Sequence, residues 1–221
     1  MASPSERLPL GRMVPAVPAG VEIPPEPPDV GARALSVASR LLAGATTFFF
    51  LAFVFAYFYL RSLNQEHLWR PKHINPNSAL GVAMVVCIAL SAVLTIIAGR
   101  QLRRRSRGWI GPAIGGLVLG LAAVGLQCVE YTVQHFGPAD GAYASVFCAW
   151  TALYLIAVMC TMYWLETQVA TELRARREPA PQEGDIKDAD RLIAPAMDAT
   201  VFYWSFLAAI GVLTYVVLYL L

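Results

Sequence analysis

Five stretches of this chain are apolar along their whole length and contain no Lys, Arg, Asp or Glu. Each is about 20 residues or longer, which is the length an α-helix needs to cross roughly 30 Å of hydrocarbon. A membrane β-barrel would instead show strands of about 10 residues with alternating polarity, and that alternation is absent. The five stretches are Leu41–Leu60, Leu80–Gly99, Trp109–Val129, Gly141–Leu165 and Ala199–Leu221.

We therefore expect an all-α integral membrane protein, built as a bundle of five transmembrane helices. Backbone groups inside lipid must find hydrogen bonds within their own segment, which favours helices for all five stretches. The predicted membrane domain covers residues 34–221. Its spans are expected at about 38–61, 78–99, 109–133, 141–167 and 199–221.

Two segments outside these spans have a different composition. Residues 1–33 contain eight prolines and no long apolar run, which predicts a flexible, partly polyproline tail rather than a secretory signal. Residues 171–198 mix acidic and basic side chains, which predicts a solvated connector with a short surface helix around 184–192. The overall composition agrees with a membrane protein, since 57% of residues are hydrophobic and only 14% are charged.

The positive charges predict the topology. Five arginines lie between the second and third spans, at 100, 103, 104, 105 and 107, and three more follow the fourth span, at 174, 176 and 177. Short loops rich in Arg and Lys remain cytoplasmic. The two loops lie on the same side in any five-span arrangement, so both predict a cytoplasmic N-terminus and an outward C-terminus. Arg70 and Lys72 in the loop 62–79 are weaker evidence against this topology.

Candidate redox chemistry is sparse. The three histidines, His67, His73 and His135, all fall in predicted outer loops, and none forms a pair at helical spacing. The four cysteines lie inside predicted spans without a C-x-x-C pair, where cysteine is commonly a small apolar residue. We therefore expect no catalytic residue, no metal ligand and no cofactor in this chain. The net charge of +2 gives no reason to expect a nucleic-acid partner.

One polar constellation lies near the outer end of the third span, at Gln127, Glu130 and Tyr131. Residues three apart share one helix face, and carboxylates inside membranes usually pair or serve a function. The favoured interpretations are a buried structural hydrogen-bond cluster and a Glu130 side chain that reaches the headgroups. A direct role in proton transfer is a third possibility.

The arginine loop also has two interpretations. Arg103, Arg104, Arg105 and Arg107 could contact anionic lipid headgroups or an acidic surface of a partner. They could equally be a topology signal with no specific contact.

Several short motifs occur in order along residues 44–221 and together resemble subunit III of haem–copper terminal oxidases, in its short five-helix bacterial form. The first span ends in A-Y-F-Y-L-R, and the third in Q-x-x-E-Y. The remaining matches are Trp69-Arg70-Pro71, Pro76-Asn77-Ser78, Tyr143-Ala144-Ser145-Val146-Phe147, Tyr203-Trp204-x-Phe206 and Leu218-Tyr219-Leu220.

The chain departs from this family at its ionisable positions. Thr46 stands where the resemblance implies a carboxylate, and Ser205 where it implies a histidine. Tyr154 and Ala157 replace an H-x-x-H pair, and the acidic residue expected near Ala208 is missing. A role in proton uptake is therefore in doubt, whereas a role as a scaffold is unaffected.

The resemblance implies a non-catalytic subunit of a respiratory complex that reduces oxygen and translocates protons. Its expected partners are oxidase subunits I and II, which would carry the haem and copper, together with phospholipids and other respiratory complexes. The expected location is the bacterial inner membrane. Alternatives are a subunit III-like component of a quinol oxidase or a nitric oxide reductase, or an unrelated membrane assembly or transport subunit.

Overall fold

The structure is a computed structural model that describes residues 30–63, 69–71, 74–177 and 186–221, except for the side chains of residues 107, 175 and 186–192. The tail 1–29, His67, His73 and connector residues 178–185 lie outside this description. The described residues form five long α-helices and no strand. The helices are α1 (Val30–Ser62), α2 (Ser78–Arg103), α3 (Ile110–Val133), α4 (Ala142–Ala175) and α5 (Ile186–Tyr215).

All five helices are long and apolar enough to cross a membrane. Two short elements complete the described structure. A 3₁₀ turn, η1 (Arg107–Trp109), leads into α3, and a π-helical turn, η2 (Val216–Leu220), follows α5 at the C-terminus. A π-turn adds a residue to the helical repeat and so changes the direction of the side chains that follow.

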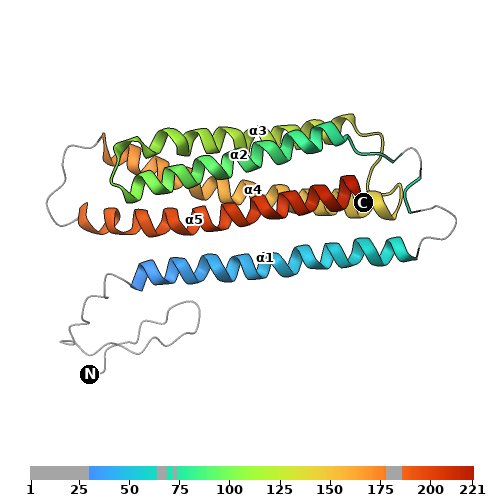
Figure 1. Cartoon of the computed structure of the whole chain (residues 1–221), viewed down its shortest axis with the longest axis horizontal. Coiled ribbons are helices and arrows are strands. Elements are labelled where there is room, and N and C mark those ends of the chain that lie inside the picture. The colour runs from blue at the N-terminus through green and yellow to red at the C-terminus, as the bar shows by residue number, and fades with distance from the viewer. Residues whose placement is uncertain (1–29, 64–68, 72–73, 178–185) are drawn as a thin grey trace, which may run out of the picture.

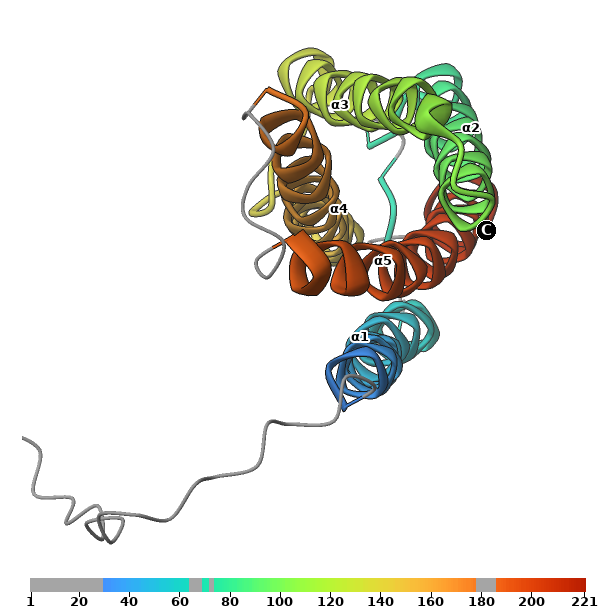
Figure 2. The same ribbon diagram turned by 90° about the vertical axis from the view of Figure 1, so that its left-hand side faces the viewer.

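The helices do not form a symmetrical five-membered bundle. Helices α2, α3, α4 and α5 surround a common interior, while α1 lies outside this group against α5 (Figure 2). Helix α1 also contacts α4. Much of its surface is therefore left to lipid or another chain, and Phe48 is 77% exposed.

The ends of the bundle differ in charge. The start of α1, the turn between α2 and α3, and the described ends of the connection between α4 and α5 lie at one end (Figure 1). We call this the arginine end, because Arg103, Arg104 and Arg105 lie there. The other end, which we call the C-terminal end, carries the described loop residues 69–71 and 74–77, the loop 134–141 and residue Leu221.

The connector between the last two spans is more helical than expected. Helix α4 continues to Ala175, and α5 already begins at Ile186 and includes Pro195. The predicted surface helix around 184–192 is thus the first part of α5 from Ile186 onward. Charged side chains do not stop a helix once it leaves the hydrocarbon, because they are good helix formers in water.

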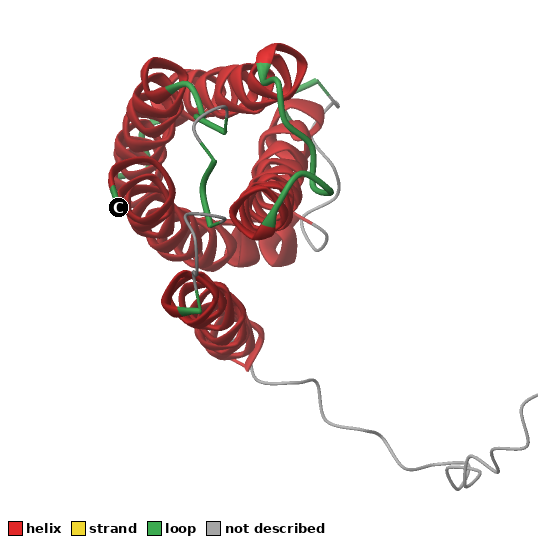
Figure 3. Cartoon of the chain, turned by 90° about the vertical axis from the view of Figure 1, so that its right-hand side faces the viewer, coloured by secondary structure: helices red, strands yellow, loops and turns green. Residues whose placement is uncertain are grey.

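At the C-terminal end, the described loop residues before α2, 69–71 and 74–77, cross the end of the four-helix group (Figure 3). Trp69 and Ile74 of this loop are buried in a cluster with Tyr57, Tyr143 and Phe147. The ring centroids of Trp69 and Tyr57 are 5.1 Å apart, and those of Trp69 and Tyr143 are 5.8 Å apart. These contacts attach the described loop residues to α1 and α4.

Candidate functional site: a buried carboxylate cluster

Glu130 lies in the last turns of α3 and faces the interior of the bundle. Its side chain is fully buried, and Gln127, one turn earlier on the same face, is 5% exposed. The amide nitrogen of Gln127 donates to Glu130 Oε2 at 3.1 Å. The spacing of three residues therefore brings the two side chains into direct contact.

The second donor to this carboxylate comes from the far end of the chain. Tyr219, in the π-turn η2, donates its hydroxyl proton to the same oxygen, Glu130 Oε2, at 2.6 Å. Donors in contact with a carboxylate make stronger hydrogen bonds than neutral pairs do. The C-terminus is thereby connected to α3 inside the bundle.

Gly81 of α2 makes room for the Tyr219 ring. A Cβ atom at this position would lie 2.8 Å from Tyr219 Cε1, closer than carbon atoms normally approach. The backbone of η2 is positioned by another phenol, because Tyr143 donates its hydroxyl to the carbonyl of Leu218 at 2.5 Å. The ring centroids of Tyr219 and Phe147 are 5.6 Å apart.

Tyr131 belongs to a neighbouring contact rather than to the carboxylate pair. Its hydroxyl is 2.7 Å from Thr151 Oγ1 on α4, and Thr151 donates to the carbonyl of Phe147. Successive residues of a helix point about 100° apart, so Tyr131 lies on a different face of α3 from Glu130. In the sequence, Tyr219 stands out only as part of the motif Leu218-Tyr219-Leu220, which does not predict a contact with Glu130.

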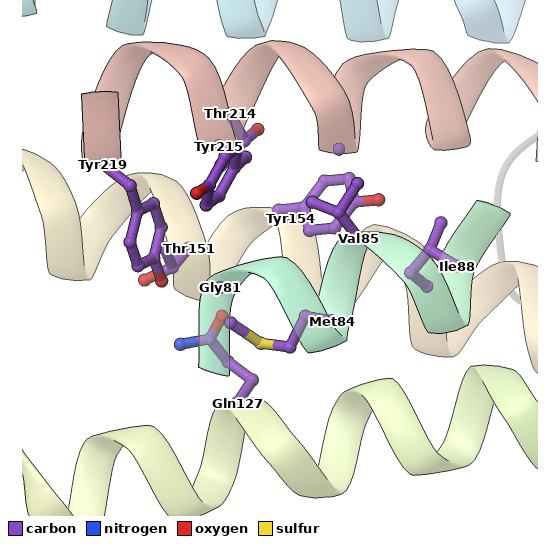
Figure 4. A pocket seen from close by; sticks show the side chains of 11 residues that line it. Gly81, Met84, Val85, Ile88, Gln127, Thr151, Tyr154, Thr214, Tyr215 and Tyr219 are labelled. Atoms are coloured by element: carbon purple, nitrogen blue, oxygen red, sulfur yellow. The ribbon is translucent and has the colours of Figure 1, made fainter. Parts of the chain in front are cut away.

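Two cavities adjoin the cluster. A small one of about 40 Å³ lies inside the bundle between Gln127, Tyr219, Thr151, Thr214 and Tyr154 (Figure 4). This volume is enough for one or two water molecules. A larger one of about 300 Å³ opens at the C-terminal end and is lined by Asn75, Asn77, Glu130, Val133, Gln134 and His135.

The arginines at the opposite end are mostly exposed. Arg103 forms an ion pair with Asp198 of α5 at 2.8 Å, which joins α2 to α5. Arg104 caps α2 with its backbone amide, and Arg105 adopts a left-handed conformation with φ of 54°. Arg107 begins η1, and its side chain lies outside the described part of the structure. Arg103, one of the four arginines predicted to contact lipid or a partner, is thus already ion-paired within the chain.

Within the described ranges, no group of three or more His, Cys, Asp or Glu side chains could hold a metal ion. Cys128 and Cys160 are exposed, and Cys87 and Cys148 are partly buried as free thiols. His135 lies exposed at the mouth of the larger cavity.

Neutral hydroxyl groups occupy positions where the sequence resemblance implied ionisable side chains. Thr46 Oγ1 lies 2.8 Å from the Tyr203 hydroxyl, which joins α1 to α5. Tyr154 donates to the carbonyl of Leu207 at 3.0 Å, which joins α4 to α5. Ser205 donates to the carbonyl of Val201 within its own helix. Two of these substitutions therefore contribute to the packing of the helices.

A family model described as cytochrome c oxidase subunit III matches residues 32–221, from the first turn of α1 to the last residue. No curated protein matches the chain.

Proposed function

Because this chain belongs to the cytochrome c oxidase subunit III family, we propose that it is the non-catalytic third subunit of a respiratory haem–copper terminal oxidase. In this role it packs beside subunit I, stabilises the complex and holds lipids. The observation that carries the proposal is the family match across all five helices, together with an interior in which polar side chains join helices to one another.

Three interior contacts illustrate this use of polar groups. Trp204 of α5 donates to Ser91 of α2 at 3.1 Å, and Ser91 in turn donates to the carbonyl of Gly116 on α3 at 2.6 Å. Trp150 of α4 donates to Thr214 of α5 at 2.9 Å. Such hydrogen bonds between helices stabilise membrane bundles by about 0.6–2 kcal/mol each. They support a rigid scaffold rather than a moving transport path.

The reaction of the complex, reduction of oxygen coupled to proton translocation, is expected to take place outside this chain. Haem and copper belong to the partner subunits I and II in this proposal. The contribution of this chain is an apolar surface, and the exposed face of α1, with Phe48, Phe49 and Phe55, is a candidate for contact with lipid or another subunit.

The proposed location is the bacterial plasma membrane, with the arginine end in the cytoplasm. The basis is the gathering of Arg103, Arg104, Arg105, Arg174 and Arg176 at one end of the helices. Loops with this composition remain cytoplasmic during insertion.

Purification of the complex tests this function. A tag on the N-terminal tail is preferable, because the C-terminal residues carry Tyr219 and because Arg61 donates to the carbonyl of Leu221. We expect extraction in a mild detergent to recover two larger partners, a haem absorption spectrum and oxygen consumption with reduced cytochrome c.

Two results would change the assignment. Oxygen consumption with a quinol but not with cytochrome c would place the chain in a quinol oxidase. Recovery of the folded chain with no haem-containing partner, under conditions in which other respiratory complexes remain intact, would contradict the proposal.

A further inference from the structure

A pocket of about 410 Å³ lies at the arginine end between α1 and α5, beside the last residue of α2. Its lining combines two arginines with one carboxylate, and we call it the arginine pocket. The side chains that line it include Ser36, Ser39 and Arg40 of α1, Arg103 of α2, and Asp198 and Phe202 of α5.

The charges of the arginine pocket do not balance. Arg103 donates from Nε and Nη2 to Asp198 Oδ1, both at 2.8 Å, so the carboxylate of the pocket already has its cation. Arg40 forms no ion pair, hydrogen bond or cation–π contact with any residue that the structure describes. A guanidinium offers several N–H donors in a planar fork that matches a carboxylate or a phosphate. The pocket is therefore suited to one further anionic group.

The face of α1 that continues outward from Arg40 has room for a close neighbour. Gly44, one turn further along, is exposed, and a Cβ atom there would have no neighbour within 4 Å among the described residues. Glycine is a poor helix former, and in membrane helices it allows another helix to approach closely. Leu51, two turns beyond Gly44 on the same face, is 52% exposed. Flexible acyl chains do not require a glycine, so this face favours a second helix over lipid.

We propose that the arginine pocket receives an aspartate or glutamate side chain from a transmembrane helix of a partner subunit. The carboxylate accepts hydrogen bonds from the Arg40 guanidinium and the Ser36 hydroxyl, and the partner helix packs along α1 on Gly44 and Leu51. The inference deepens the proposed function and rests on it only for the identity of the partner, which is then subunit I.

Removal of the charge at Arg40 tests the contact. Arg40→Gln is purified through the N-terminal tag, and the haem recovered per mole of chain is compared with that of the wild-type preparation. We expect a severalfold loss of haem in Arg40→Gln and a recovery in Arg40→Lys, since lysine restores the charge. Arg174→Gln is the matched control, because Arg174 is an exposed arginine at the same end of the bundle, on α4. Full haem recovery in Arg40→Gln would overturn the proposal.

Added bulk tests the packing face. Gly44→Leu should keep a partner helix away from α1 and so lower the haem recovered per mole of chain. Gly125→Leu is the matched control, because a Cβ atom at Gly125 of α3 also has no neighbour within 4 Å among the described residues. Equal losses of haem in the two variants would overturn the assignment of this interface to α1.

Cross-linking identifies the anion. A carbodiimide condenses a lysine amine with a neighbouring carboxyl group into an amide and takes up the water as a urea. In native membranes that contain Arg40→Lys, we expect an amide between residue 40 and an Asp or Glu of another polypeptide, mapped by mass spectrometry of the peptides. A link to Asp198 alone would count against the proposal. Loss of an anionic phospholipid from Arg40→Gln without any link between polypeptides would show that a lipid phosphate occupies the pocket, and would also overturn it.

Failure of this inference differs from failure of the proposed function. A wild-type preparation without haem contradicts the proposed function, whereas equal haem in the wild type and in Arg40→Gln contradicts only the contact at Arg40. Cross-linking in native membranes does not depend on haem, so it tests the partner contact in either case. Because Arg40 is exposed, the yield of folded chain in size-exclusion chromatography should be the same for each Arg40 variant as for the wild type.

Discussion

At the scale of single residues, the carboxyl group of Glu130 links elements that are far apart in the sequence. Its Oε2 accepts from Gln127 on the same helix and from Tyr219 in the C-terminal turn. Burial of a polar group lowers the stability of the protein only slightly when the group has hydrogen-bond partners, whereas burial without partners is strongly destabilising. The identity of this side chain should therefore matter more for assembly than its charge.

Replacement of Glu130 tests this argument. We expect Glu130→Leu to lower the yield of assembled protein, because Gln127 and Tyr219 would each lose an acceptor at a cost of about 1–3 kcal/mol. Glu130→Gln keeps an acceptor oxygen and should be tolerated. The measurement is the amount of folded chain in the membrane, followed by thermal unfolding in detergent. Loss of oxygen reduction in an intact Glu130→Gln complex would instead favour a role in proton transfer.

The contribution of the Tyr219 hydroxyl group can be tested against a control variant at the neighbouring Tyr215. Tyr219→Phe removes the hydroxyl group but keeps the ring that packs on Gly81 and Phe147. We expect this variant to lose about 1–3 kcal/mol of stability, since a donor to a carboxylate is lost. Tyr215→Phe is the control, because Tyr215 stacks on Tyr219 at 5.2 Å between ring centroids. Equal losses in both variants would show that the Glu130 contact is unimportant.

At the scale of elements, the close approach of α2 and α3 depends on small residues. A Cβ atom at Gly116 would lie 2.8 Å from Thr95 Oγ1 and 3.3 Å from the carbonyl oxygen of Ser91. Ser91 also donates to the Gly116 carbonyl, so the two backbones are held together at this point. Small residues allow this kind of contact between membrane helices.

Alanine substitutions at two glycines of α3 should have opposite effects on the stability of the protein. Gly116→Ala should destabilise the protein by about 1–3 kcal/mol, the usual cost of overpacking a filled interface. Gly125→Ala should be neutral or slightly stabilising, because a Cβ atom there would have no neighbour within 4 Å and alanine favours the helix. Thermal unfolding of the two variants in the same detergent gives the comparison. A Gly125→Ala variant as unstable as Gly116→Ala would contradict the close-contact explanation.

At the scale of the whole molecule, an odd number of spans places the two termini on opposite sides of the membrane. The arginine end should be cytoplasmic because positive loops are retained there. The structure gathers both arginine-rich connections at one end, as the topology requires, but the side of the membrane remains a prediction.

Reporter fusions give the orientation. A reporter that is active only in the cytoplasm should be silent when fused after Leu221 and active when fused ahead of Arg33. The reciprocal reporter, active only outside, should give the opposite pattern. Bright cytoplasmic signal from the Leu221 fusion would mean that the predicted topology is inverted.

The candidate site could be predicted only in part. Gln127 and Glu130 are three residues apart on one helix, so their contact follows from helix geometry. Adjacency in the sequence places Tyr131 with them, yet its hydroxyl lies against Thr151 in the structure. Tyr219 could not be identified as the second donor, because its distance of 89 residues from Glu130 is closed only by the packing of η2 on α2 and α4.

The sequence by itself determined the five membrane helices and the resemblance to an oxidase subunit. Both depend on local information, since hydrophobic length and backbone hydrogen bonding are properties of one segment at a time. The tertiary structure decided that α1 lies outside the other four helices and that the last five helical residues form a π-turn bearing Tyr219. These features depend on which helix faces meet, and nearly every face of a membrane helix is apolar, so the hydrophobic pattern does not distinguish the faces.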